Sequence, residues 1–461
     1  MISTKKKPRL DVALSSTTSY TPLLAWLERC GATGLDHLRF EMSPLGSLGC
    51  FAGRDFAVGD ELFSVPWSCI VTFNDTERSP TVALVKEGVA AAVAASSSLM
   101  TAELLLWVFL IEQRATTDES SSSSSSTYGP FLSSLDATSP SPLSWPGDLL
   151  KALEATNIGT MAAAKATLEQ QLELLTAVRR WGEVQRKDPH ALTVLREHVD
   201  LAALQWARGH YLARRYPAHF AGDVKGSSSG PPGVAREVGL ENLGALVPLL
   251  DILNHSDEED FLAFDVRDGR LHVLCNHARQ AGDELLSNYG LLSNERLVFA
   301  YGFAVADNPY DTVALKLMCG QGSGGGEVTN VGTYYVGRGG VEGVPPELWR
   351  ALSALVGEED EEEKAGEETE GGGAVEVGME EFQVLRDFVG SKLRTLEASE
   401  PAAAAALARV GDADPRCAFV RHYRDGQHQI CKDLFEALTG VLAEADDADE
   451  VEEADEDGDE H

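Results

Sequence analysis

The sequence predicts an α+β fold, in which a β-rich unit is split by a helical insertion and followed by a separate, mostly helical domain. Short strand-like segments occur before residue 72 and return after residue 245, and long segments with helical spacing of apolar residues lie between them. At 461 residues, 43% of them hydrophobic, the chain can bury two or three domain cores. This composition excludes wholesale disorder.

We expect six consecutive segments of different character. They are residues 1–19 (disordered), 20–110 (first β-rich part), 111–243 (helical insertion with a serine-rich loop), 244–304 (second β-rich part), 305–443 (helical domain with an acidic insertion at 357–373) and 444–461 (disordered acidic tail).

The first β-rich part opens with a helix at residues 22–30, where Pro22 precedes apolar residues at helical spacing. Residues 103–113 are apolar nearly all round, which predicts a buried helix. Strands are expected between these helices, separated by glycine and proline turns, at residues 49–56, 61–65 and 69–72.

The insertion is expected to be helical around two loops. Ser120 to Ser126 form an unbroken serine run, and residues 225–233 are rich in Gly, Ser and Pro, so both segments are expected to be loops. The helices are expected at residues 146–154, 161–185 and 191–216.

Strand-like segments return in the second β-rich part. Asp268-Gly269 lies between residues 261–266 and 270–275, which predicts a β-hairpin. The remaining elements are expected to be a strand at 284–288, a helix at 293–301, strands at 311–318 and 333–336, and helices at 346–356, 380–396 and 426–443.

The net charge of −35 is concentrated in two acidic runs. Residues 358–370 hold nine acids and one lysine, and residues 444–460 hold twelve acids and no base. Such runs are usually solvated, and they also attract basic partners. The two runs therefore suit basic partners such as histone-like or ribosomal tails. Direct binding to nucleic acid is not expected, because its phosphates would be repelled.

Seven cysteines are scattered without a CxxC pair or a Cys/His cluster of zinc spacing, as in a reducing compartment. We expect a monomer in the cytoplasm or nucleus, with no metal and no membrane span. The basic run Lys5 to Arg9 fits nuclear import. A single acid, Asp11, among several Ser and Thr in the first 20 residues leaves a chloroplast transit peptide as the alternative.

Three motifs carry the chemistry of the chain. They are the glycine-containing residues 48–62 (LGCFAGRDFAVGDEL), the apolar run 246–256 (LVPLLDILNHS) and the strand-like residues 282–290 (GDELLSNYG). Three further segments accompany them, at residues 206–216 (WARGHYLARRY), 293–303 (SNERLVFAYGF) and 421–427 (RHYRDGQ).

In this order the motifs resemble those of SET-domain protein methyltransferases. The split organisation is similar to that of the Rubisco large-subunit methyltransferase family, which includes the actin-histidine methyltransferases. The resemblance covers about residues 25–443. It implies a SET-domain β-fold of small sheets with a pseudoknot, split by the helical insertion, and a mostly α-helical C-terminal substrate-binding domain. It also implies S-adenosyl-L-methionine as the cofactor, and substrates such as ribosomal proteins, actin or Rubisco.

The residue types fit this cofactor, which carries an ammonium and a carboxylate. Gly49 allows close backbone approach because no Cβ intervenes. The amide oxygen of Asn254 can accept from the ammonium, and Arg214 can pair with the carboxylate. The resemblance places the cofactor contacts at Leu48, Gly49, Arg214, Asn254, His255 and Tyr289.

The resemblance also assigns the catalytic residues. Tyr289 is the expected catalytic tyrosine, because its hydroxyl can steer a nucleophile without a strong base. Tyr301 is expected to serve catalysis as a second aromatic wall that contacts substrate, and Asp251 is expected to be a substrate-side carboxylate. A substrate lysine must be neutral to attack, and both low dielectric and the neighbouring sulfonium lower its pKa.

Two positions depart from the family pattern. Ser47 stands where a glycine is usual, and Ala213 stands where a polar residue usually precedes the arginine. Three functions stay open at this level. They are methylation of a protein lysine, methylation of a protein histidine in the same pocket, and a catalytically silent SET-fold module that binds partners through its acidic runs.

Overall fold

The computed structural model describes residues 20–43, 47–92, 98–118, 126–158, 160–221, 243–257, 262–319, 329–356 and 377–456. The chain forms two compact units: the first comprises residues 1–144 and 161–291, and the second comprises 145–160 and 292–461. The division therefore falls after Leu291 rather than after residue 304, and residues 145–160 belong to the second unit rather than to the insertion. The expected disordered N-terminus, serine run (120–125), linker 225–233 and acidic insertion 357–373 lie outside the described residues.

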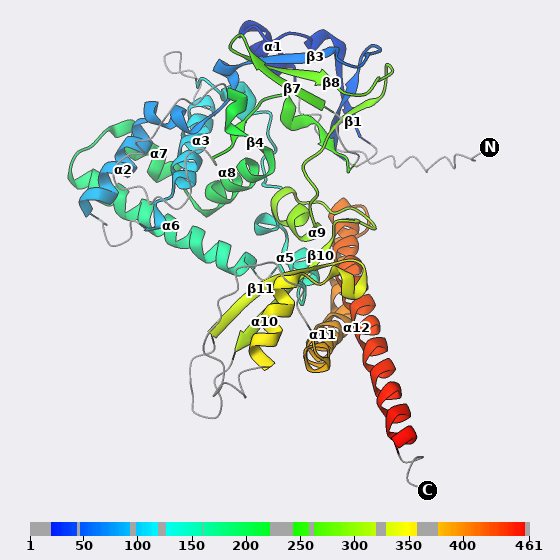
Figure 1. Ribbon diagram of the computed structural model, residues 1–461. Helices are drawn as coiled ribbons and strands as arrows, with labels where there is room; N and C mark the ends of the chain where they lie inside the picture. The colour runs from blue at the N-terminus through cyan, green and yellow to red at the C-terminus, as the bar shows by residue number, and fades with distance from the viewer. Residues whose placement is uncertain are drawn as a thin grey trace, which may run out of the picture. The chain divides into compact units, whose positions relative to one another are not determined.

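The described strands of the first unit form three small sheets. Their orders are β1-β2-β9-β6, β3-β8-β7 and β4-β5. Figure 1 shows β3, β7 and β8 side by side. The strand bounds are β1 Leu38–Met42, β2 Leu48–Ala52, β3 Glu61–Pro66, β4 Arg215–Tyr216, β5 Ala245–Leu246, β6 Asn254–His255, β7 Leu262–Arg267, β8 Arg270–Cys275 and β9 Glu284–Ser287.

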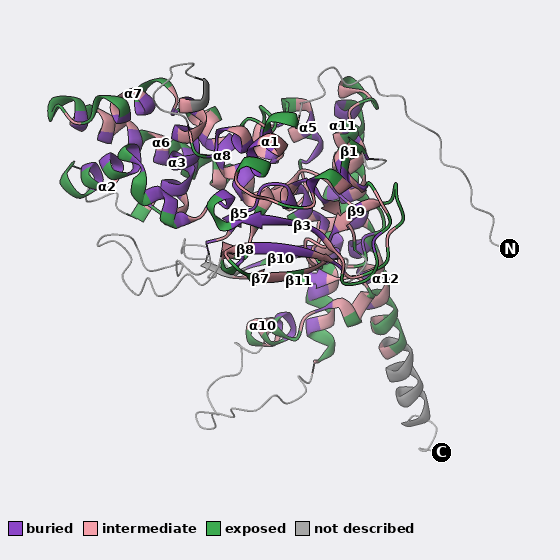
Figure 2. Cartoon of the chain, turned by 90° about the horizontal axis from the view of Figure 1, so that it is seen from above, coloured by how far each residue is buried: buried purple, intermediate pink, exposed green. Residues whose placement is uncertain are grey.

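The expected hairpin is confirmed in β7 and β8. Asp268 and Gly269 both have positive φ, 52° and 74°, as a two-residue turn of this kind requires. Strand β8 lies between β3 and β7. Strands β3 and β8 are largely buried and β7 is not, as Figure 2 shows.

Two local expectations in the first unit are wrong. Residues 69–72 do not form a strand: the 3₁₀ turn η2 (Trp67–Cys69) is followed by a single bridge from Val71 to Leu246. The helix expected at 191–216 is two helices, α7 (Pro189–Glu197) and α8 (Leu201–Arg214). The side chain of Asp200 accepts a hydrogen bond from the N–H of Ala203 and so caps a new helix start.

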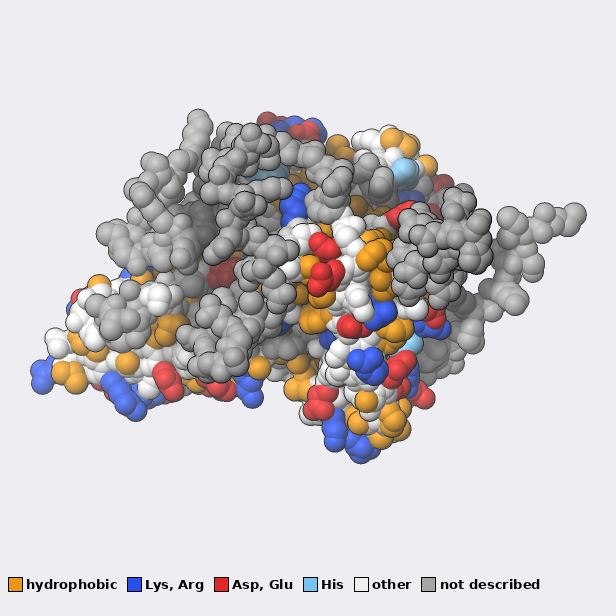
Figure 3. All heavy atoms as spheres, turned by 60° about the horizontal axis from the view of Figure 1, so that its bottom comes forward, with side chains coloured by type: hydrophobic (Ala, Val, Ile, Leu, Met, Phe, Trp, Pro, Cys, Tyr) orange, Lys and Arg blue, Asp and Glu red, His pale blue; other side chains and the backbone are white. Residues whose placement is uncertain are grey.

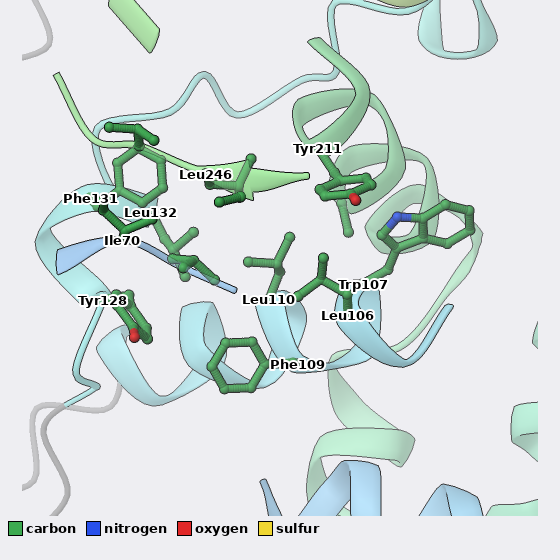
Figure 4. Packing of buried hydrophobic residues seen from close by; sticks show 14 of the residues in the cluster. Ile70, Leu106, Trp107, Phe109, Leu110, Tyr128, Phe131, Leu132, Tyr211 and Leu246 are labelled. Carbon is green, nitrogen blue, oxygen red and sulfur yellow. The ribbon is translucent and has the colours of Figure 1, made fainter. Parts of the chain in front are cut away.

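The helices expected at 22–30, 103–113 and 161–185 are present as α1, α3 and α6, and α2 and α4 are additional helices of the first unit. Helix α3 is confirmed as buried, because residues 104–111 are all inaccessible. Figure 4 shows Leu106 and Leu110 of α3 on the side that faces Leu246 and Tyr211. The helix bounds are α1 Thr21–Arg29, α2 Pro80–Ala92, α3 Ala102–Asp118, α4 Gly129–Leu132 and α6 Thr160–Val184.

The second unit combines a two-stranded antiparallel sheet with long helices. Its elements are α5 Gly147–Ala152, α9 Asn294–Arg296, η9 Leu297–Tyr301, β10 Thr312–Cys319, β11 Thr329–Gly337, η10 Gly340–Gly343, α10 Pro346–Val356, α11 Met379–Val410 and α12 Pro415–Glu456. Helix α11 passes through Pro401, and α12 continues through Glu456. The expectation of a disordered tail is therefore wrong for residues 444–456, which are helical.

A buried arginine ties residues 145–160 to the second unit. Arg424 of α12 is 4% exposed. It donates to the carbonyl oxygens of Ala152 and Glu154, both at 3.0 Å, and to the carboxylate of Glu400 at 3.0 Å. A buried guanidinium is stable only when its donors find acceptors, so this segment and Arg424 depend on each other.

The described surface carries charges of both signs. On the face in Figure 3, acidic and basic side chains are interspersed with hydrophobic ones rather than gathered into one patch. None of the described helices combines the length and the apolar character that a membrane crossing requires.

Truncation of the α3 core should measure how much this packing stabilises the protein. Leu110 is 1% exposed, so we expect Leu110→Ala to lower the free energy of unfolding by about 2–5 kcal/mol, since it removes buried methyl groups and leaves a cavity. Urea denaturation followed by tryptophan fluorescence measures this change. Val184→Ala, at a 78% exposed position, is the control and should change it by less than about 0.5 kcal/mol. Equal effects of the two changes would contradict the assigned packing.

Candidate functional site

One sheet brings together the three motifs identified in the sequence. Strand β9 pairs antiparallel with β2 on one side and parallel with β6 on the other, where Asn254 lies opposite Leu286 and His255 opposite Ser287. Residues 206 positions apart in the chain, Leu48 and Asn254, therefore come into hydrogen-bond contact. Tyr289 follows β9 by two residues.

Both the nitrogen and the oxygen of the Asn254 side-chain amide form hydrogen bonds. Its Nδ2 donates to the carbonyl oxygen of Leu48 at 3.1 Å and to Oε1 of Glu284 at 2.8 Å. Its Oδ1 accepts from the hydroxyl of Ser47 at 2.9 Å. The other carboxylate oxygen of Glu284 accepts from the buried hydroxyl of Ser43 at 2.8 Å.

Gly49 is necessary for a reason that the sequence did not reveal. A Cβ at this position would clash with Oε1 of Glu284 and would lie 3.2 Å from Nδ2 of Asn254. The absence of a side chain at Gly49 thus makes room for the contact between Glu284 and Asn254. Close approach of a ligand to the backbone is a separate prediction for the same residue.

His255 orients the segment that carries Tyr289. Nδ1 of His255 accepts a hydrogen bond from the backbone N–H of Tyr289 at 3.2 Å, and the two ring centroids are 5.1 Å apart. An accepting Nδ1 requires the neutral ring with its proton on Nε2. Burial lowers the pKa of His255, which favours the same neutral form.

The phenol of Tyr289 donates its proton to the carbonyl oxygen of Leu253 at 2.7 Å. A tyrosine hydroxyl has one proton, so this oxygen can still accept hydrogen bonds but has no second proton to donate. The loop that supplies the carbonyl is strained at Leu249, whose φ is +78°, a conformation that costs about 1–3 kcal/mol.

Arg214 and Asp251, expected on the cofactor and substrate sides, form an ion pair with each other. Nε of Arg214 lies 3.2 Å from Oδ2 of Asp251 without forming an aligned hydrogen bond, and the side chains are 19% and 4% exposed. Burial raises the pKa of Asp251 to about 6, although the charge of Arg214 opposes that shift.

Tyr20 lies beside this ion pair. Burial, and then the charge of Asp251, raises the pKa of Tyr20 to about 12. Its ring stacks on Phe40 of β1, with centroids 5.8 Å apart. Tyr20 was not predicted as a site residue. It directly precedes helix α1, and nothing in the sequence at that position indicated a functional role.

Tyr301 belongs to the second unit, at the end of the π-helical turn η9, and its ring centroid lies 6.2 Å from that of Phe303. Its role as a wall of the substrate channel stays a prediction. Across the described residues, no group of three His, Cys, Asp or Glu side chains is arranged to hold a metal ion.

Glu284 and Ser43 are the polar residues that the motif analysis missed. Glu284 lies inside the quoted GDELLSNYG segment, and an acid at the start of a short strand beside two leucines is the signal that could have identified it. Ser43 carried no such signal, because its partner is 241 residues away.

The fold defined by these sheets and helices is that of a SET domain. A crystal structure of the SET domain of LSMT bound to lysine and AdoHcy superposes with a TM-score of 0.63 at 17% sequence identity, covering 92% of this chain and 91% of that one. A structure of Rubisco LSMT bound to AdoMet gives a TM-score of 0.59 at 17% identity, with 94% of each chain covered. The SET-domain fold class predicted from the motifs is thereby confirmed.

Curated sequence relatives carry methyltransferase names. The chain is 38% identical over 79 residues to ribosomal lysine N-methyltransferase set10 of Schizosaccharomyces pombe, 26% over 214 residues to ribosomal lysine N-methyltransferase 1 of Saccharomyces cerevisiae, and 23% over 193 residues to the actin-histidine N-methyltransferase of Mus musculus. The matches cover 17, 41 and 42% of this chain.

These matches span only part of each relative, 14, 34 and 29% of their respective lengths. No protein-family model matches the chain. The resemblance to the Rubisco large-subunit methyltransferase family is confirmed. The relatives include proteins named as lysine methyltransferases and as histidine methyltransferases, and the fold agrees with both.

The raised pKa of Asp251 predicts a specific pH dependence of stability. The pKa is about 6 in the folded protein against an ordinary 3.8, so the contribution of this group is fully present below about pH 3.8 and is lost as the pH rises through about 6. We expect the unfolding free energy of the unmodified protein, relative to Asp251→Asn, to fall by about 3 kcal/mol between about pH 3.5 and pH 7. Urea titrations of both proteins across this range measure the difference. A difference that is constant with pH would refute the shift.

Proposed function

We propose that this chain is an S-adenosylmethionine-dependent protein methyltransferase and that the acceptor is a lysine side chain. The observation that carries the proposal is the convergence of Leu48-Gly49 on β2, Asn254-His255 on β6 and Tyr289 just after β9. The SET-domain fold and the names of the curated relatives support the same chemistry.

The polar groups of the first unit suit the charged end of this cofactor. Oδ1 of Asn254 accepts from Ser47, and an amide oxygen has a second lone pair for an ammonium. Nε of Arg214 lies 3.2 Å from Oδ2 of Asp251 without an aligned hydrogen bond, and a guanidinium has five N–H donors, so it can pair with a second carboxylate. Together these two residues would hold the ammonium and the carboxylate of the amino-acid end.

The bound cofactor would supply an electrophilic methyl group on a positively charged sulfur. Because Tyr289 donates its proton to Leu253, its oxygen faces a reaction partner as an acceptor. An acceptor oxygen stabilises a positively polarised carbon and orients the N–H groups of an attacking amine. Tyr289 would thus align the attacking amine and stabilise the polarised methyl carbon, and it would not act as a general base.

The assignment to lysine rests on named relatives. Two curated relatives are named lysine methyltransferases, and solved structures of similar fold hold lysine or monomethyllysine. Histidine is the second candidate, because the mouse relative is named an actin-histidine methyltransferase and covers 42% of this chain. The acidic runs at residues 358–370 and 444–460 favour a basic protein substrate through electrostatic attraction.

The role of Tyr289 predicts a separation between catalysis and cofactor binding. Tyr289→Phe removes the acceptor oxygen but keeps the ring, so turnover should fall by roughly 100-fold while affinity for S-adenosylmethionine changes by less than about threefold. Single-turnover kinetics and calorimetry measure the two quantities. Tyr335→Phe, which removes an exposed hydroxyl, should alter neither. Unchanged turnover in Tyr289→Phe would show that this oxygen is not used.

Identification of the acceptor residue tests the function as a whole. Purified protein is incubated with a cell lysate and S-adenosylmethionine that carries a labelled methyl group, with Tyr289→Phe as the blank, and the modified residues are found by mass spectrometry. Tyr289-dependent label on lysine is the expected result. Label on histidine would favour the second candidate, and cofactor binding without label on any protein would favour a silent binding module.

A further inference from the structure

Glu284 is the charged side chain at the candidate site to which no role has been assigned. We propose that Glu284 is a positioning residue: its carboxylate fixes the amide of Asn254 so that the amide oxygen, and not the amide nitrogen, faces the ammonium of the bound cofactor. This inference rests on the proposed function, because the ammonium belongs to S-adenosylmethionine.

The acceptors around Asn254 determine which way its amide points. Nδ2 has two protons and meets two acceptors, the carbonyl of Leu48 at 3.1 Å and the carboxylate of Glu284 at 2.8 Å. In the flipped orientation, Oδ1 would face both oxygens with no proton between them. Hydrogen bonds to charged acceptors contribute roughly twice as much as neutral ones, so the carboxylate dominates this choice.

The opposite side of the amide is the side that suits a cation. There Oδ1 accepts from the exposed residue Ser47 and keeps one lone pair. A flipped Asn254 would present its NH₂ group, which repels an ammonium. The orientation of this single amide therefore decides whether Asn254 attracts or repels the ammonium of the cofactor.

Glu284 is itself held in place. Its second oxygen accepts from the buried hydroxyl of Ser43 at 2.8 Å, and Gly49 leaves the space that its first oxygen occupies. Successive residues of a strand face opposite sides, so Glu284 lies on the same side of β9 as Leu286, the residue opposite Asn254. Contacts from β2, from β6 and from the segment after β1 thus converge on one carboxylate of β9.

A carboxylate could also act by its charge alone, and a glutamine separates the two effects. Glu284→Gln keeps an acceptor for Nδ2 of Asn254 and can donate to the hydroxyl of Ser43, but it carries no charge. Glu284→Ala removes the acceptor. Glu41→Ala is the matched control, because Glu41 is a 58% exposed carboxylate on strand β1 of the same sheet.

Calorimetry with two ligands tests the proposal on the full chain. S-adenosylmethionine has the ammonium, whereas 5′-methylthioadenosine lacks the whole amino-acid end. We expect Glu284→Ala to bind S-adenosylmethionine about tenfold more weakly and 5′-methylthioadenosine as well as the unmodified protein does. Glu284→Gln should recover most of the loss, and Glu41→Ala should match the unmodified protein with both ligands.

Each other outcome has a defined meaning. Unchanged affinity in Glu284→Ala overturns the inference and leaves the proposed function standing. The inference is also overturned if Glu284→Ala loses affinity equally for both ligands. It is likewise overturned if Glu284→Gln binds S-adenosylmethionine as weakly as Glu284→Ala does. Failure of the unmodified protein to bind S-adenosylmethionine overturns the proposed function and this inference together.

Should Glu284→Ala fail to fold, Ser43→Ala provides the same test with a smaller change. Loss of the hydroxyl frees the carboxylate, and we expect about threefold weaker binding of S-adenosylmethionine with no change for 5′-methylthioadenosine. Unchanged binding of both ligands by a folded Ser43→Ala would overturn the inference in the same way.

Discussion

The candidate site depends on the double pairing of β9. This four-residue strand is bonded to β2 on one side and to β6 on the other, so it brings chain segments from both ends of the first unit into contact. Only two residues of β6 take part, Asn254 and His255, and both are site residues. Because side chains alternate between the faces of a strand, a shift of register by one residue would turn Asn254 away from Glu284. The register of this sheet therefore determines the geometry of the candidate site.

Every candidate functional group on this sheet is oriented by a neighbour. Glu284 and the carbonyl of Leu48 orient Asn254, the backbone N–H of Tyr289 orients His255, and the carbonyl of Leu253 orients the phenol of Tyr289. In a partly buried environment such bonds are stronger than in water, and the loss of one partner costs more. Groups held in this way lose little conformational entropy when they align a ligand.

Features of the fold that depend on neighbouring residues in the chain could be predicted from the sequence. Features that depend on contacts between residues far apart in the chain could not. The hairpin at Asp268-Gly269 and the buried helix α3 follow from turn preference and apolar periodicity. Residues 69–72 have strand composition, yet only Val71 finds a partner. The acidic residues up to Glu456 continue α12 although charge repulsion suggested disorder. Among the site residues, Asn254, His255 and Tyr289 carried motif signals, while the partnership of Glu284 with Ser43 exists only once the register is known.

The proposed binding of a ligand carboxylate by Arg214 has to be reconciled with the ion pair that Arg214 forms with Asp251. Their contact of 3.2 Å is not an aligned hydrogen bond, and a pKa of about 6 means that Asp251 is mostly ionised at physiological pH but takes up a proton at a small free-energy cost. A ligand carboxylate that pairs with Arg214 draws the positive charge away from Asp251 and so raises its pKa further. Proton uptake by Asp251 would then remove one of two competing negative charges from a buried site, where an unpaired charge is costly. If Arg214 binds a ligand carboxylate as proposed, the elevated pKa of Asp251 would let it change partners without leaving a buried anion behind.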